Sequence, residues 1–133
     1  MIYLGRDKEY MMSANSNTIL LVEDDEQTVA LINHIFGHSC TNVVSLASNK
    51  LCQLNKLIQN HHPTLIILDY MSIRRDYDTT LVHLKSFVPM IPTVIMTTID
   101  DDTLSASFDY TIRKPFYKAD IFMIMQDAVQ RSL

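Results

Sequence analysis

Acidic side chains stand where two strongly apolar runs of this chain stop. Ile19-Leu20-Leu21-Val22 is followed by Glu23-Asp24-Asp25, and Leu65-Ile66-Ile67-Leu68 is followed by Asp69. Each run is typical of a strand buried on both faces, so the acids fall at carboxyl ends of strands, where open parallel sheets bind ligands. Carboxylates gathered there repel one another unless a cation or a proton intervenes. The pattern therefore indicates a site for a hard divalent metal such as Mg²⁺, together with a phosphate-like group.

Strand and helix patterns alternate along the chain from Thr18 onwards. The predicted strands are apolar runs at residues 19–22, 43–46, 65–68, 93–96 and 110–113. The predicted helices carry inward-facing apolar residues three and four positions apart. These residues are Val29, Ile32, Ile35 and Phe36 in the first helix, Leu51, Leu54, Leu57 and Ile58 in the second, Leu81, Leu84 and Val88 along a third predicted over 79–87, and Ile121, Ile124, Met125 and Ala128 in a last helix over 118–131. The alternation predicts an α/β fold, a doubly wound parallel sheet with helices on both faces.

Single residues indicate where these helices begin and end. Gly37 is expected to close the first helix in a left-handed conformation, and Ser48 is expected to cap the start of the second. Pro89 is expected to stop the third helix. The stretch from Arg74 to Asp78 follows the strand that ends in Asp69 and is interpreted as a solvated loop.

Length and composition favour one domain and give no sign of nucleic acid or membrane partners. A chain of 133 residues with net charge −4 can bury one core, and its basic residues form no patch that would attract nucleic acid. No apolar run approaches the about 20 residues that span a membrane. Residues 1–17 lack the apolar segment of a signal peptide, so we expect a cytoplasmic protein. Residues 1–17 are predicted to form a flexible tail, with Met1, Met11 and Met12 all open as start sites, and residues 18–133 to form the domain.

The cysteines and histidines give no sign of a second metal site. Cys40 and Cys52 form no CxxC pair and are expected to be buried or half-buried thiols rather than a disulfide. The pair His61-His62, and His34 with His38, are interpreted as surface or loop residues, because no further ligand falls nearby at metal-binding spacing.

Four short segments, in sequence order, resemble the receiver domains of two-component response regulators, the family that includes the chemotaxis response regulator. They are Ile19 to Asp25, Leu65 to Asp69, Ile91 to Thr97, and Lys114-Pro115-Phe116. The resemblance covers nearly everything from residue 18 to the C-terminus. It implies a flavodoxin-like fold with five parallel strands. It also implies phosphorylation of the central aspartate by a histidine kinase or a histidine phosphotransfer protein.

The resemblance assigns metal-binding roles to the acids. It implies that Asp24 binds Mg²⁺ directly and that Glu23 acts through a water. Asp69 and the main-chain carbonyl of Met71 are expected to supply further oxygens. Asp25 is interpreted as an acid of the first helical turn, favoured there by the helix dipole, and not as a ligand.

The phosphoryl chemistry is expected to involve three side chains. Asp69 is the candidate nucleophile, because a carboxylate at a strand end can form an aspartyl phosphate. Lys114 can hold the phosphoryl oxygens as a mobile point charge, and the Thr97 hydroxyl can donate a hydrogen bond to the same group. The resemblance also implies that the Lys114-Pro115 peptide bond is cis, which is uncommon even before proline.

Three residues next to the expected site depart from the family pattern. Receivers usually carry proline four residues after the phosphorylated aspartate and glycine soon after, where this chain has Ile73 and Arg74. We expect an unusual path for the segment that leaves the site. Thr98 replaces the small residue that usually follows the switch hydroxyl, and its branched side chain is expected to restrict Thr97.

The region between Thr97 and Lys114 is shorter than the family uses. Its 17 positions leave only residues 101–107 for the fourth helix, which is therefore predicted to be short or missing. The aromatic switch position of receivers is occupied by Thr111. Tyr110 could substitute only if the strand register slipped, since a slip of one residue turns a side chain to the opposite face.

The sequence thus predicts a stand-alone receiver, a Mg²⁺-dependent phosphoacceptor rather than an enzyme, which signals by contact with a downstream protein. A homodimer is left open. Met71 and Ile99 occupy positions that tune dephosphorylation in the family, and their apolar character predicts a long-lived phosphoryl group. Two alternatives stay open: a pseudo-receiver that acts as an interaction module without phosphorylation, and, less favoured, a flavodoxin-like cofactor binder or enzyme. The second is disfavoured because neither glycine of the chain, Gly5 or Gly37, follows a predicted strand.

Overall fold

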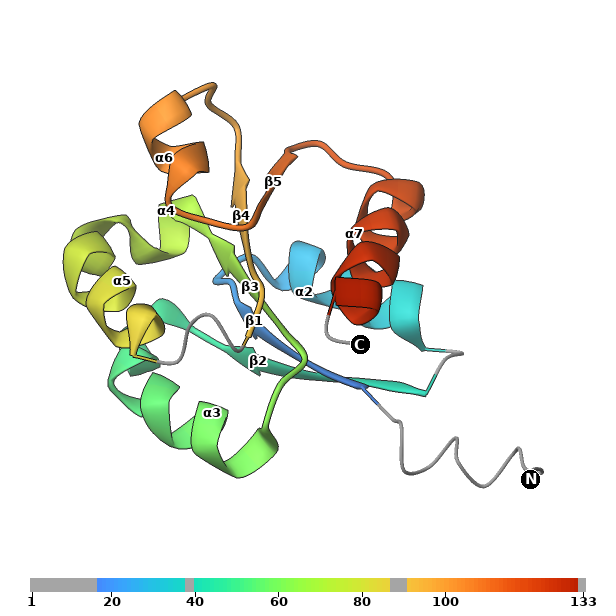
Figure 1. The fold of residues 1–133 in the computed structure, drawn as a ribbon, viewed down its shortest axis with the longest axis horizontal. Helices are drawn as coiled ribbons and strands as arrows, with labels where there is room; N and C mark the ends of the chain where they lie inside the picture. Colours follow the sequence, from blue (N-terminus) through green and yellow to red (C-terminus); the bar gives the residue numbers. More distant parts are fainter. Residues whose placement is uncertain (1–16, 38–39, 87–90, 132–133) are drawn as a thin grey trace.

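The chain folds into a five-stranded parallel sheet with helices on both faces (Figure 1). The computed structural model describes residues 17–37, 40–86 and 91–131. The strands are β1 (Asn17–Val22), β2 (Thr41–Leu46), β3 (Leu65–Asp69), β4 (Thr93–Thr97) and β5 (Tyr110–Arg113). Their order in the sheet is β2-β1-β3-β4-β5, and every pair is parallel. This is the predicted flavodoxin-like doubly wound arrangement, in which the strand order reverses between β1 and β3.

The helical segments lie on the two faces of this sheet (Figure 1). On one face lie α2 (Glu26–Phe36) and α7 (Lys118–Arg131). On the other lie α3 (Leu54–His61), α4 (Tyr70–Ile73), α5 (Tyr77–Lys85), α6 (Asp102–Ala106) and the short 3₁₀ helices η1 (Ser48–Gln53) and η2 (Arg74–Asp76).

Alternate residues of each central strand pack against opposite layers, because successive side chains of a strand point to opposite faces. One apolar cluster joins the sheet to α2 and α7 and includes Ile19, Leu21, Leu65, Ile67, Ile32, Ile35, Ile121 and Met125. The other joins the sheet to α3, α4, α5 and α6 and includes Leu20, Val22, Ile66, Leu68, Leu54, Ile58, Ile73, Leu84 and Leu104. Burial on both faces explains why these strands are continuous apolar runs.

Two of the predicted helix ends are wrong. Gly37 follows α2 with φ −62° and ψ −20°, which is right-handed, and its N–H donates to the carbonyl of His34. The helix ends in a tightened last turn, in which a residue three positions later donates to the carbonyl, and this turn does not require a left-handed residue. Ser48 does not cap α3, because it is the first residue of η1, whose N-cap position holds Ala47.

The predicted loop after β3 is helical. Asp69, the last residue of β3, is also the N-cap of α4, and α4, η2 and α5 follow with no gap from Tyr70 to Lys85. The interpretation of residues 74–78 as a loop was therefore wrong, and the third helix begins at Tyr77 rather than at residue 79. Without the proline and glycine that receivers usually carry here, helical geometry continues directly from the end of the strand.

Other surface predictions have mixed outcomes. Cys40 and Cys52 are free but exposed, so the prediction of buried or half-buried thiols was wrong. His34, His61 and His62 are exposed, as predicted. His38, the predicted stop at Pro89 and residues 1–16 of the predicted tail lie outside the described residues, and β1 begins at Asn17, the last residue assigned to that tail. Within the described ranges, no helix combines the length and apolar character needed to cross a membrane.

The fourth major helix is short, as predicted. α6 has 5 residues and is preceded by its N-cap Asp101, whose carboxylate accepts hydrogen bonds from the N–H groups of Thr103 and Leu104 at 2.9 and 3.1 Å. A helix of this length has few bonds of its own, so its cap supplies much of its local stability.

We expect Asp101→Ala to lower the free energy of unfolding by about 1 kcal/mol, the usual effect of losing an N-cap side chain. Urea unfolding followed by circular dichroism measures this change. Asp102→Ala is the matched control, because this neighbouring acid is in the first turn but is not the cap. An equal loss in both variants would contradict the capping role.

Candidate functional site

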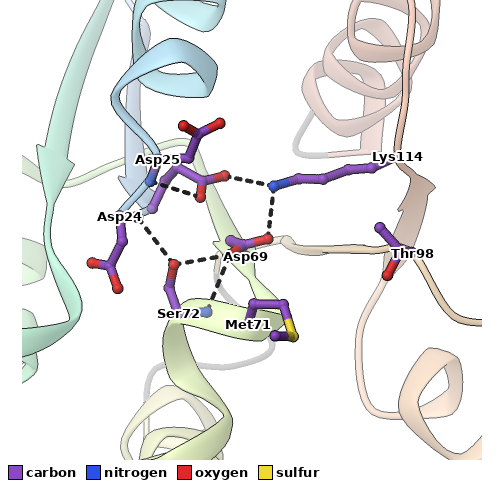
Figure 2. Close-up of a pocket in the computed structure, with 8 residues that line it drawn as sticks. Asp24, Asp25, Asp69, Met71, Ser72, Thr98 and Lys114 are labelled. Carbon is purple, nitrogen blue, oxygen red and sulfur yellow. Dashed lines mark hydrogen bonds and ion pairs between the residues drawn. The ribbon is translucent and has the colours of Figure 1, made fainter.

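The predicted site residues lie at the carboxyl edge of the sheet, beside the point where strand order reverses. They come from the ends of β1, β3, β4 and β5 and from the residues that follow these strands, which parallel pairing brings to the same edge. A pocket of about 390 Å³ opens there (Figure 2), lined by Glu23, Asp24, Asp25, Asp69, Met71, Ser72, Thr98 and Lys114.

One lysine forms ion pairs with two buried carboxylates in this pocket. The Nζ of Lys114 lies 3.0 Å from Glu23 Oε1 and 2.8 Å from Asp69 Oδ1, and Figure 2 shows its side chain reaching across to Asp69. The side chains of Glu23 and Asp69 are only 1% and 6% exposed, whereas that of Lys114 is 21% exposed. Since buried charges need a partner, the two ion pairs to this lysine offset part of the cost of burying the two acids.

Burial and the mutual contacts shift the pKa values of Glu23 and Lys114. Burial raises the pKa of Glu23 above its ordinary value, and the charge of Asp69 adds to the rise, although the hydrogen bond from Lys114 opposes it. Burial alone would lower the pKa of Lys114, but its hydrogen bonds and charge interactions with Asp69 and Glu23 outweigh burial and raise that pKa. The lysine is therefore a fixed positive charge at neutral pH.

A serine that sequence reasoning missed holds the second oxygen of Asp69. Ser72 donates to Asp69 Oδ2 from its Oγ at 2.8 Å and from its N–H at 3.1 Å. The same Oγ accepts from the main-chain N–H of Asp24 at 3.0 Å, which ties β3 to the end of β1. Because Lys114 occupies Oδ1, both oxygens of the candidate nucleophile are fixed in direction. The spacing of Asp69 and Ser72, cap and third helical residue, is the signal that could have revealed this contact.

The three acids after β1 have different environments. Glu23 points into the pocket, and its Oε2 accepts from the N–H of Asp25 at 3.2 Å. The carboxylate of Asp25 accepts from Thr28 and Gln27 and caps α2, so its predicted role as a helix-starting acid is confirmed. The hydrogen bond from the Thr28 hydroxyl is the main cause of the lowered pKa of Asp25.

Asp24 is turned away from the other acids. Its two carboxylate oxygens accept from the N–H and the Oγ of Ser48, each at 2.7 Å. Figure 2 shows this carboxylate pointing away from Asp69 and Lys114. The structure therefore brings Glu23, Asp69 and Lys114 together and leaves the expected direct metal ligand outside that group.

The predicted switch hydroxyl is buried and engaged elsewhere. Thr97 Oγ1 accepts from the N–H of Ile99 at 3.1 Å, and the carbonyl of Thr97 accepts from the N–H of Lys114 at 2.9 Å. Its neighbour Thr98 is the threonine that lines the pocket. Thr97 thus positions the backbone of the lysine, while its hydroxyl makes no hydrogen bond with Asp69 among the described residues.

The strand that carries the lysine keeps its register. Tyr110 pairs with Val94, packs partly into the α2 and α7 cluster, and donates its hydroxyl to Asp127 on α7. Thr111 is exposed. No register slip brings Tyr110 to the position of an aromatic switch. The peptide bond between Lys114 and Pro115 is cis, as predicted.

The donor atoms at the pocket suit Mg²⁺, a hard cation that prefers oxygen ligands. Glu23 and Asp69 direct carboxylates into the pocket, and Met71 lies on its wall with its side chain exposed. Among the described residues, no group of three or more His, Cys, Asp or Glu side chains is arranged to hold a metal. The donor chemistry fits the metal, but Asp24 must change orientation before it can join the ligands.

The fold is that of receiver domains. A two-component response regulator from Clostridium difficile is similar with a TM-score of 0.71 and 18% identity, over 86% of this chain and 97% of that one. The N-terminal signal receiver domain of a response regulator from Bacteroides fragilis gives 0.70 and 19%, over 84% and 95%. The pseudo-receiver domain of the CikA protein gives 0.64 and 16%, over 85% and 97%. No protein-family model matches the sequence, and no curated protein resembles it significantly.

Proposed function

We propose that this chain, which has the receiver fold, is a Mg²⁺-dependent aspartyl phosphoacceptor in a two-component phosphorelay. Asp69 would take the phosphoryl group from a histidine kinase or a histidine phosphotransfer protein in the cytoplasm, and a downstream protein would read the result by contact. The observation that supports this most is the pairing of one lysine with two buried carboxylates at the strand edge. A phosphoryl group on Asp69 would meet that lysine directly.

The chemistry follows from the contacts. An oxygen of Asp69 attacks the phosphorus, the bond from phosphorus to the donor nitrogen breaks, and the nitrogen keeps the bonding electrons. Lys114 lies 2.8 Å from Asp69 Oδ1 and is positioned to neutralise the negative charge on the incoming phosphoryl oxygens. Ser72 fixes the direction of the carboxylate, which favours in-line attack. Mg²⁺, held by Glu23, Asp69, Met71 and a reoriented Asp24, would supply further charge neutralisation.

The pseudo-receiver alternative is supported by two contacts. Asp24 is hydrogen-bonded to Ser48 rather than directed into the pocket, and the Thr97 hydroxyl accepts from Ile99. A module fixed in this arrangement would keep the fold and the buried acids, and would bind partners without taking a phosphoryl group.

Phosphate incorporation separates the two functions. We expect the wild-type chain, incubated with acetyl phosphate and Mg²⁺, to gain the mass of one phosphoryl group on the intact protein. Asp69→Asn should abolish this gain, whereas Asp76→Asn, the same change at an exposed aspartate on η2, should leave it unchanged. Absence of incorporation by the wild type from acetyl phosphate and phosphoramidate alike would favour the pseudo-receiver.

A further inference from the structure

The carboxylate of Asp24 is held by the residue that begins the segment after β2. Ser48 donates to Asp24 Oδ1 from its N–H and to Oδ2 from its Oγ, each at 2.7 Å. Both contacts are short, charge-assisted hydrogen bonds. Asp24 thereby satisfies the first free N–H of η1 from a part of the chain 24 residues earlier.

The main chain of Asp24 is fixed from the opposite side. Its N–H donates to Ser72 Oγ at 3.0 Å, and Ser72 is itself bound to Asp69. The backbone is therefore anchored to the phosphoacceptor strand while the side chain is anchored to η1. For Asp24 to face the pocket with this backbone in place, its side chain must rotate and leave both donors of Ser48.

We propose that Ser48 is a positioning residue that weakens Mg²⁺ binding by holding the Asp24 carboxylate out of the site, so that metal binding releases the first turn of η1. This inference rests on the proposed function, because it takes the acids and Asp69 as the metal site. In this proposal Mg²⁺ competes with the N–H and the hydroxyl of Ser48 for the Asp24 carboxylate, and this competition lowers the affinity for Mg²⁺.

The loss of the contact between Ser48 and Asp24 would also affect a second pocket. Ser48 also lines a cavity of about 470 Å³ between η1 and α5, together with Asn49, Cys52, Asp76, Thr80 and His83. The hydrogen bonds between Asp24 and Ser48 therefore connect the proposed metal site to this cavity. A change in the orientation of Asp24 reaches the surface formed by η1, η2 and α5.

Mg²⁺ titrations of the purified chain, without a phosphodonor, test the proposal. We expect Ser48→Ala to bind Mg²⁺ about tenfold more tightly than the wild type, because it loses one hydrogen bond to a charged group while the N–H remains. Ser48→Thr keeps the hydroxyl and should bind like the wild type. Asn49→Ala changes the neighbouring residue of the same cavity and should also leave the affinity unchanged. Calorimetry gives the dissociation constants.

Amide NMR of the wild type supplies a second measurement that does not depend on a variant. Saturation with Mg²⁺ should shift the amide signals of residues 48–53 and speed hydrogen exchange at Ser48, because its N–H loses the Asp24 acceptor. Shifts confined to residues 23–25 and 69–72 would overturn the proposal.

The outcomes separate this inference from the proposed function. Tighter binding by Ser48→Ala supports the inference, including the case in which only this variant binds detectably. If the wild type binds Mg²⁺ and takes a phosphoryl group while Ser48→Ala binds no more tightly, the inference fails and the function stands. If neither protein binds Mg²⁺, both fail.

Discussion

Replacing Lys114 by Met is expected to lower the free energy of unfolding at pH 7 by about 3 kcal/mol, in the range found when one partner of a buried ion pair is removed. The variant leaves the carboxylates of Glu23 and Asp69 facing each other with no cation between them. Both side chains are almost fully buried, so water compensates only in part for the lost ammonium group. Chemical denaturation in buffer free of divalent cations measures the loss.

The same variant is expected to become more stable as the pH falls from 7 towards 4. In the wild type, burial already raises the folded pKa of Glu23 above its unfolded value, and the hydrogen bond from Lys114 limits that rise. Without the lysine the folded pKa rises further, so the folded state binds the proton more tightly than the unfolded state. Stability is then highest below the unfolded pKa and is lost as the pH rises through the folded pKa.

The wild type should show a smaller loss over the same pH range, because the hydrogen bond from Lys114 limits the rise in the folded pKa of Glu23. The raised pKa of Lys114 means that its contribution is fully present below the unfolded lysine pKa and disappears only as the pH rises through the folded value. Lys56→Met removes an exposed lysine of α3 and is the matched control, with an expected change within about 0.5 kcal/mol. A Lys114→Met variant whose stability is the same at pH 5 and pH 7.5 would contradict the electrostatic account.

The strands and the strand order could be predicted because their signals are local and strong. Ile19 to Val22 and Leu65 to Leu68 have no polar residue, and such short runs are typical of a strand covered on both faces. The shortness of α6 followed from counting residues between Thr97 and Lys114. The extension of helical structure from Asp69 to Tyr77 was missed because the polar residues of that stretch also suit a loop.

The main charges of the site could be predicted, but not their hydrogen bonds. Strand ends place Glu23, Asp69 and Lys114 at one edge of the sheet, so their meeting follows from topology. The orientation of Asp24 depends on Ser48, which lies on a different element, and no local pattern predicts a contact of that kind. The engagement of the Thr97 hydroxyl by Ile99 depends in the same way on the path of the chain after β4.

These contacts connect the site to helices on one face of the sheet. Asp69 caps α4, and the helical stretch from α4 through α5 follows without a break. On the other side, α6 is short and Tyr110 is bound to α7, so the region that normally reports phosphorylation in receivers has fewer parts that can move. The serine that links Asp69 to both α4 and β1 is therefore the residue whose loss should be most informative.

Ser72→Ala is expected to lower the free energy of unfolding by about 2 kcal/mol, because it removes the acceptor of the Asp24 N–H and one donor of Asp69 Oδ2 from a buried position. If Asp69 is the phosphoacceptor, the freed carboxylate also samples more directions, and phosphorylation by phosphoramidate should slow by about tenfold. Urea unfolding and intact-protein mass spectrometry over time measure the two effects.

Ser86→Ala is the matched control, since this serine on the end of α5 is exposed and its hydroxyl donates only within its own helix, to the carbonyl of Val82. Native Ser72 differs from Ser86 because its Oγ links α4 to Asp69 at the end of β3 and to Asp24 after β1. A loss of stability with an unchanged phosphorylation rate would mean that Lys114 alone orients Asp69, because Oδ1 would then be fixed without help from Oδ2. Slower phosphorylation of Ser72→Ala than of Ser86→Ala, under conditions in which both variants are folded, would assign the orientation of the Asp69 carboxylate to Ser72. A purely structural role of Ser72 would leave the phosphorylation rate of the folded protein unchanged.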